Sequence, residues 1–128
     1  MRRIAAVATA LTLLAPLPAL ATDYPLTVEN CGLAVTFEKA PERAVTIKST
    51  ATELLLSLGL GETIVGIGFQ DGPLPDDLAA AGANLTVLAD KLPSQEVVLG
   101  TEPDFIYGGW ESNFAADGAG ERPTLHQL

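Results

Sequence analysis

The stretch "TIKSTATELLLSLGLGETIVGIG", residues 46–68, decides the fold class. A short β-branched run at 44–47 leads through a polar turn into a leucine-rich segment, and a second β-branched run follows at 63–67. A strand, a helix and a strand joined by tight turns predict a right-handed βαβ unit with parallel, buried strands. The sequence therefore predicts an α/β fold, a Rossmann-like lobe built on a parallel sheet.

The leucine-rich segment has the start, face and end signals of a helix. Thr50 and Glu53 fit a capping box, and Gly59 is placed to end the helix in the left-handed conformation. The apolar positions that recur at helical spacing are Ala51, Leu54, Leu55 and Leu58. This face is predicted to pack on the sheet.

The rest of the chain contains shorter elements. The predicted ones are a β segment at 24–37 around a turn at 30–32, a helix at 75–81, a strand at 85–88, a helix at 94–99 capped by Ser94, a strand at 105–107 and a helix beginning near 122. The chain stops where this last helix begins, so we expect the front part of a longer protein.

The amino terminus predicts export. Two arginines, an apolar run at 4–14 and the small-residue end Ala19-Leu20-Ala21 form a secretory signal peptide, with cleavage after Ala21. A membrane anchor is the weaker alternative, because the apolar run is short and prolines interrupt its end. The mature chain is then expected to be free in an exported compartment.

Charge and cysteine content limit the partners. Without Arg2 and Arg3, five basic and sixteen acidic residues leave a net charge of −11. Such a chain repels phosphate backbones, so nucleic acid and anionic membranes are poor partners. Cys31 is the single cysteine, and it could be buried, free or paired outside this chain.

The loops that follow the predicted strands carry the candidate ligand-binding residues. In open parallel sheets, ligands bind beyond the carboxyl ends of the strands. The residues at those positions are Lys48, Ser49 and Thr50 after the first strand, Phe69 and Gln70 after the second, Lys91 before the Ser94 helix, and Trp110 and Glu111 after the last strand.

Several of these residues have a structural alternative, and Phe69 shares that of Trp110. Lys48, Ser49 and a helix amino terminus suit a carboxylate or phosphate, but Thr50 could merely cap the helix and Lys48 could be solvated. Trp110 follows two glycines and could stack on a ring-bearing ligand, or it could pack against a neighbouring loop.

Catalytic and metal-binding patterns are missing from the sequence. The one histidine, His126, has no convincing serine or cysteine partner, and one His and one Cys far apart do not make a transition-metal site. There is also no GxGxxG or P-loop motif. We therefore expect a non-enzyme without a metal site or resident cofactor.

Two stretches carry a family resemblance. "YPLTVENCG…VTFEKAPERAVTIKSTATELLLSLGL…IVGIG" and "VLADKLPSQEVVLGTEPDFIYGGWESNF" resemble the opening of periplasmic substrate-binding proteins of ABC importers, of the iron-siderophore, haem and cobalamin type. The resemblance runs from Tyr24 to about Leu125 and lies in the order of the motifs.

The resemblance implies two α/β lobes joined by a rigid helix, with the ligand in the cleft between them. Residues 22–128 would then form an incomplete amino-terminal lobe of a periplasmic protein, which hands its ligand to an ABC permease and ATPase in the inner membrane. It also implies that Asp76 or Asp77 docks on the permease, and that Cys31 has its disulfide partner beyond this chain and is a free thiol here.

Other hypotheses stay open at the sequence level. "TIKSTATELLLSLGLG", "DK" and "GWESNFAADGAGER" resemble a subgroup proposed to transport F420-0, a deazaflavin precursor. An exported α/β enzyme with catalytic residues beyond Leu128 is a rival, and a Ser/His/Asp set in that extension would favour it. A nonfunctional gene fragment is the third reading.

Overall fold

The computed structural model describes residues 22–127. The predicted signal peptide, residues 1–21, therefore lies outside the described residues. No helix in the described part is long and apolar enough to cross a bilayer.

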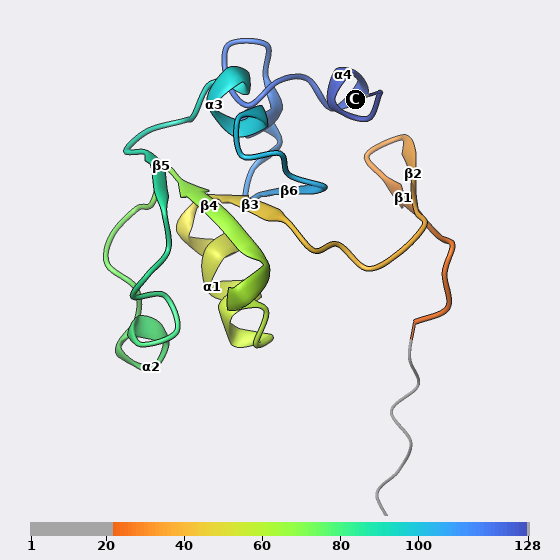
Figure 1. Ribbon diagram of the computed structural model, residues 1–128. Coiled ribbons are helices and arrows are strands. Elements are labelled where there is room, and N and C mark those ends of the chain that lie inside the picture. The colour runs from red at the N-terminus through yellow and green to blue at the C-terminus, as the bar shows by residue number, and fades with distance from the viewer. Residues whose placement is uncertain (1–21, 128) are drawn as a thin grey trace, which may run out of the picture.

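A β-hairpin opens the described chain. Strands β1 (Leu26–Asn30) and β2 (Leu33–Phe37) pair antiparallel, and the turn residues Cys31 and Gly32 take φ values of 50° and 80°. The hairpin contacts the rest of the molecule through Phe37, whose ring centroid lies 5.9 Å from that of Phe105, and through the carbonyl of Asn30, which accepts a hydrogen bond from the Arg122 side chain. The predicted β segment around this turn is thus an antiparallel pair beside the main sheet (Figure 1).

Four parallel strands form the main sheet, in the order β5-β4-β3-β6. Their bounds are β3 (Ala44–Ile47), β4 (Ile64–Gly68), β5 (Val87–Ala89) and β6 (Phe105–Gly108). Every residue of β3 is buried, as its central position and β-branched composition predict. The predicted parallel α/β fold is confirmed.

Helices cover both faces of this sheet. On one face lie α1 (Ser49–Ser57) and α2 (Asp76–Ala79), and on the other lie α3 (Gln95–Leu99) and α4 (Arg122–Leu125) (Figure 1). Two short 3₁₀ turns, η1 (Gly61–Thr63) and η2 (Glu111–Phe114), precede β4 and follow β6. The core has two parts, one per face: Ala44, Leu55, Leu56, Ile64 and Ile67 form the first, and Val45, Ile47, Val98 and Ala119 form the second.

The start and the buried face of α1 differ from the prediction. The helix begins at Ser49 with Lys48 as its N-cap residue, and no side chain caps it, so the capping box at Thr50 is wrong. The buried residues are Ala51, Thr52, Leu55 and Leu56, whereas Leu54 and Leu58 are exposed. Three consecutive leucines, residues 54–56, allow the helix to bury either of two neighbouring faces. In the observed arrangement the buried face includes Thr52, whose hydroxyl is hydrogen-bonded to the buried hydroxyl of Thr46 at 2.7 Å.

The other predicted elements lie within two residues of the observed ones. Gly59, at φ 75°, follows the helix end as predicted. Ser94 caps α3, because its hydroxyl accepts a hydrogen bond from the amide of Val97 at 3.4 Å. Local capping and turn chemistry therefore placed most element boundaries correctly.

Candidate functional site

The four parallel strands end together at one edge of the sheet. The amide of Lys48 donates to the carbonyl of Gly68 at 3.0 Å, and the amide of Gly109 donates to the carbonyl of Ile47 at 2.9 Å. The amide of Phe69 likewise donates to the carbonyl of Ala89 at 3.1 Å. We call the loops that begin at Lys48, Phe69, Asp90 and Gly109 the strand-end rim.

The strand-end rim contains the point where the chain direction across the sheet reverses. From β3 the chain passes to α1 on one face, and from β6 it passes to η2 and α4 on the other face (Figure 1). Ligands of open α/β sheets bind at such a switch point. At Gly109 the two loops meet closely, because a Cβ atom there would lie 2.7 Å from Thr50 Oγ1 and 3.0 Å from Lys48 Cβ. A glycine at this position therefore allows the two loops to touch.

Lys48 lies in this rim, but its ammonium is engaged. Nζ lies 2.6 Å from Oδ1 of Asp71 and 3.6 Å from the centroid of the Phe69 ring. The Lys48 side chain is only 13% exposed, so it is not the solvated charge that the sequence allowed as an alternative, and its contact with a ligand stays a prediction. Asp71 was missed by the sequence analysis, although the strand-end rule also reaches the loop after β4.

Ser49 and Thr50 differ in their surroundings. Ser49 Oγ accepts a hydrogen bond of 2.7 Å from the amide of Asp71, which ties the loop after β3 to the loop after β4. Thr50 is exposed and faces Gly109 rather than capping the helix. Thr50 is therefore available to a ligand, while Ser49 joins the two loops.

Gln70 is anchored inward. Its amide nitrogen donates to Thr52 Oγ1 and to the carbonyl of Gly68, each at 3.1 Å. Thr52 is in turn hydrogen-bonded to Thr46 under the sheet end. Gln70 thus holds the loop after β4 against α1, and its side chain is half-buried.

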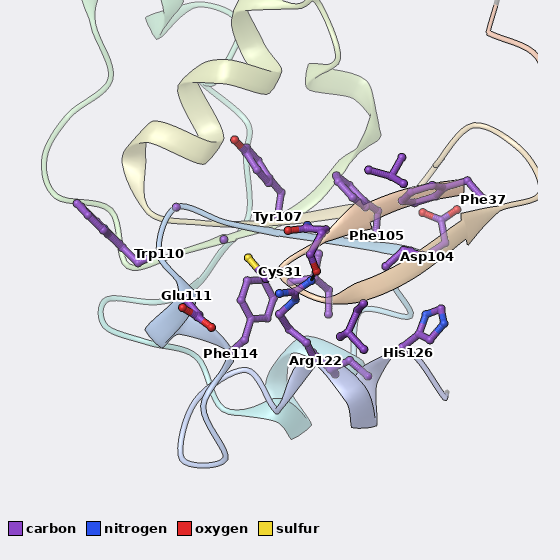
Figure 2. A pocket seen from close by; sticks show the side chains of 18 residues that line it. Cys31, Phe37, Asp104, Phe105, Tyr107, Trp110, Glu111, Phe114, Arg122 and His126 are labelled. Atoms are coloured by element: carbon purple, nitrogen blue, oxygen red, sulfur yellow. Dashed lines mark hydrogen bonds between the residues drawn. The ribbon is translucent and has the colours of Figure 1, made fainter. Parts of the chain in front are cut away.

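Trp110 combines a fixed backbone with a free side chain. Its amide donates to Oδ1 of the buried Asn113 at 3.0 Å, and its carbonyl accepts from the Asn113 amide at 3.0 Å. The residue is 60% exposed, and its indole points away from the hairpin (Figure 2). Packing against a neighbouring loop therefore does not account for Trp110, and a flat ligand could stack on it. Glu111 follows, exposed, in η2.

The remaining predicted residues lie farther from this pairing of loops. Lys91 is exposed after β5, which is the opposite edge of the described sheet from β6. Asp76 and Asp77 begin α2, are exposed and lie on the face covered by α1 (Figure 1). The structure thus brings together the loops that hold Lys48, Ser49, Thr50, Phe69 and Gln70, with Lys48 and Thr50 next to Gly109, and places the two aspartates on α2.

A hollow between the hairpin and β6 is a feature that the sequence analysis did not anticipate. It has a volume of about 550 Å³ and is lined by apolar side chains of β1, β2, β6, η2 and α4, among them Phe37, Phe105, Tyr107 and Phe114. Cys31, Arg122 and His126 also line it (Figure 2), and it includes Gly109, Trp110 and Glu111 of the strand-end rim. The apolar character of residues 33–37 and 105–107 was the available signal, but nothing in it indicates that the two segments lie side by side.

Titratable groups outside the rim add little to the site. Lys39, which precedes β3, donates a hydrogen bond of 2.7 Å to Glu42, and this bond and then the charge attraction raise the pKa of Lys39 above its ordinary value of 10.5. Cys31 is exposed and free among the described residues. Within residues 22–127 no group of three or more His, Cys, Asp or Glu side chains is placed to hold a metal ion.

Several proteins similar to this chain in sequence or fold are named as binding proteins. No protein-family model matches the chain. A protein of Halobacterium salinarum named as a cobalamin-binding protein is 30% identical over 90 residues, which cover 67% of this chain and 23% of that relative. The same match is found in two strains of this organism. The chain therefore spans less than a quarter of the length of these relatives.

Solved structures match a larger part of the chain. A periplasmic binding protein from Veillonella parvula superposes with a TM-score of 0.67 at 31% identity, over 80% of this chain and 35% of that one. A chain from the crystal structure of an ABC-type Fe³⁺-hydroxamate transport system of Saccharomonospora viridis gives a TM-score of 0.57 at 28% identity, over 66% of this chain and 32% of that one. The chain thus has the parallel-sheet α/β fold of one part of periplasmic binding proteins.

Proposed function

We propose that this chain provides one ligand-binding lobe of the solute-binding component of an ABC importer. It captures a metal chelate, such as a ferric siderophore, haem or cobalamin, or a similar bulky organic ligand. It then delivers this ligand to a permease and ATPase of the inner membrane. In this proposal residues 22–128 form the amino-terminal lobe, which acts in the periplasm after removal of the signal peptide.

The observation that supports this proposal is the arrangement of the strand-end rim. An exposed indole at Trp110 stands on a backbone fixed by Asn113, beside the touching loops of Lys48, Thr50 and Gly109. A rigid aromatic wall next to polar groups suits a large ring-bearing or chelated ligand. Such a surface contacts one side of a ligand, so we expect tight binding to need a second lobe on the other side.

The names of two similar proteins support the same proposed function. The match in Halobacterium salinarum is named for cobalamin, and the match in Saccharomonospora viridis is named for an Fe³⁺-hydroxamate transport system. Both names concern bulky metal complexes. We propose binding and transport rather than catalysis for this chain on that basis, and we propose no resident cofactor.

A deazaflavin precursor of the F420-0 type is the second candidate. The observation that favours it is the neighbourhood of a lysine and an exposed tryptophan at the same sheet edge, since such a ligand is flat and anionic. Binding of an anionic deazaflavin would use the positive charge of Lys48, whereas binding of a neutral hydroxamate chelate would not. Experiments on Lys48 can therefore separate the two candidates.

Fluorescence of Trp110 tests the proposal. Trp110 is the only tryptophan, so the emission of the purified protein reports on this one position. We expect a saturable change on titration with at least one member of a panel of ferric hydroxamate, haem, aquocobalamin and deazaflavin. N-acetyl-tryptophanamide titrated with the same ligands corrects for their light absorption.

Variants then localise the effect. Trp110→Ala is expected to weaken binding about tenfold in equilibrium dialysis, because the stacking wall is lost. Leu58→Ala removes a similarly exposed apolar side chain near the far end of α1 and is expected to leave binding unchanged. Equal binding by both variants would exclude Trp110 from the site, and no response to any ligand would contradict the proposed function.

A further inference from the structure

The ammonium group of Lys48 is enclosed between a carboxylate and an aromatic ring. Asp71 Oδ1 lies 2.6 Å from Nζ, and the Phe69 ring centroid lies 3.6 Å from it. The two charged side chains differ in exposure, because Lys48 is 13% exposed and Asp71 is 55% exposed. The cation is therefore nearly withdrawn from water, while its counter-ion borders on solvent.

The backbone holds this group in place. Lys48 has φ 85° and ψ 146°, and Phe69 has φ 51°, so both residues take conformations that non-glycine residues seldom adopt. The amide of Asp71 is also tied to Ser49 Oγ at 2.7 Å. The backbone position of Lys48 in the strand-end rim is thus imposed by the fold at an energetic cost.

We infer that Asp71 is an exchangeable counter-ion, which occupies the place on Lys48 that an anionic oxygen group of the ligand takes when it binds. A nearly buried ammonium needs an anion beside it at all times, because leaving it unpaired is costly. The carboxylate of Asp71 can turn toward water as the ligand enters, since it is already half exposed. Lys48 then keeps an anionic partner before and after binding.

This inference deepens the proposed function, on which it rests for the existence of a ligand. It assigns that ligand a carboxylate or a phosphate at this edge of the sheet. A ligand without such a group leaves the Lys48–Asp71 pair intact and gains nothing from Lys48. Asp71 would therefore determine specificity by competing with the anionic group of the ligand.

The test uses inorganic phosphate and acetate, so it does not depend on knowing the ligand. Each anion is titrated into the purified protein at constant ionic strength, and the backbone amide shifts of residues 48–50 and 69–71 are followed by ¹H–¹⁵N NMR. Asp71→Asn is expected to strengthen binding of at least one anion about fivefold, because the anion no longer competes with the carboxylate of Asp71. A gain of about fivefold corresponds to the upper end of the interaction energies of partly exposed ion pairs. Asp71→Ala is expected to have the same effect, and this variant shows whether the gain depends on the asparagine side chain itself.

Two further variants make the result specific. Lys48→Gln placed in the Asp71→Asn background is expected to remove the gain. Glu62→Gln removes one negative charge in η1, before the amino end of β4, and is expected to leave anion binding unchanged. Stronger binding of phosphate alone would assign the ligand a phosphate, and of acetate alone a carboxylate. Unchanged binding of both anions in both Asp71 variants would overturn the inference, whether or not a chelate binds at Trp110.

Discussion

Lys48 occupies a backbone conformation that is almost confined to glycine, with φ 85° and ψ 146°. Its neighbours explain how this conformation is maintained. The amide of Lys48 donates a hydrogen bond to the carbonyl of Gly68, and the carbonyl of Lys48 accepts from the amides of Ala51 and Thr52. The ammonium of Lys48 forms an ion pair with Asp71. At the scale of one residue, the candidate site therefore combines strain in the main chain with a satisfied side chain.

Comparison of glycine and alanine at this position measures the strain. We expect Lys48→Gly to be more stable than Lys48→Ala by about 1 kcal/mol, because only glycine takes this conformation freely. Both variants lose the ammonium, so the loss of the ion pair cancels in the difference. Urea unfolding followed by circular dichroism measures the two free energies.

Thr50 offers the control with the opposite sign. It lies in the first turn of α1 without a positive φ, so Thr50→Gly is expected to be less stable than Thr50→Ala by roughly 0.5–1 kcal/mol. If glycine is the less stable substitution at both positions, Lys48 is not strained in solution.

At the scale of elements, α1 shows which local signals are sufficient. Gly59, at φ 75°, ends the helix, and the amides of Leu58, Gly59 and Leu60 bond carbonyls of its last turn. This signal acts within a few residues, so it can be read from the sequence. The buried face of the same helix cannot be read from the sequence, because it depends on which residues of the sheet α1 packs against.

Replacing Gly59 tests the helix end. Gly59→Ala is expected to lower the free energy of unfolding by about 1 kcal/mol, because a Cβ atom is disfavoured at positive φ. No atom lies within 4 Å of the added Cβ, so the cost would come from the backbone alone.

Gly72 provides the matched control for this substitution. It also has open space around it and has no positive φ, so Gly72→Ala is expected to be neutral or slightly stabilising. Equal effects of the two substitutions in urea unfolding would contradict the assigned role of Gly59.

At the scale of the whole molecule, the sheet carries a core on each face. Leu55 of α1 packs on one face and Val98 of α3 packs on the other, and both are buried. The residues of β3 alternate between the two cores, with Ala44 in one and Val45 in the other. The central strand therefore couples the stability of the two layers.

Truncating each core tests this coupling. Leu55→Ala is expected to cost about 2–5 kcal/mol and Val98→Ala about 2 kcal/mol, from lost burial and the cavity that remains. In each variant the urea curves from far-ultraviolet circular dichroism and from Trp110 fluorescence are expected to coincide, as in a single cooperative transition. Two separated transitions would show that the faces unfold independently.

Much of the candidate site followed from one rule about parallel sheets. The β-branched runs at 44–47 and 63–67 and the helix between them predicted parallel strands whose following loops share an edge. This rule located Lys48, Phe69, Gln70 and Trp110 at strand ends without coordinates. It could not reveal that Asp71 pairs with Lys48, or that the hairpin and β6 enclose a hollow, since both depend on how loops and strands distant in sequence pack.

The amino-acid sequence by itself determined the α/β class, the order of the elements, their approximate ends and the surface character of Trp110. These features depend on periodicity, turn residues and caps, which act over a few neighbouring residues. Only the tertiary structure decided which face of α1 is buried, that Thr50 faces Gly109 instead of capping the helix, and that Lys48 is neutralised by Asp71. Those outcomes depend on contacts between segments far apart in the chain, where several partners satisfy the same local pattern and packing selects one.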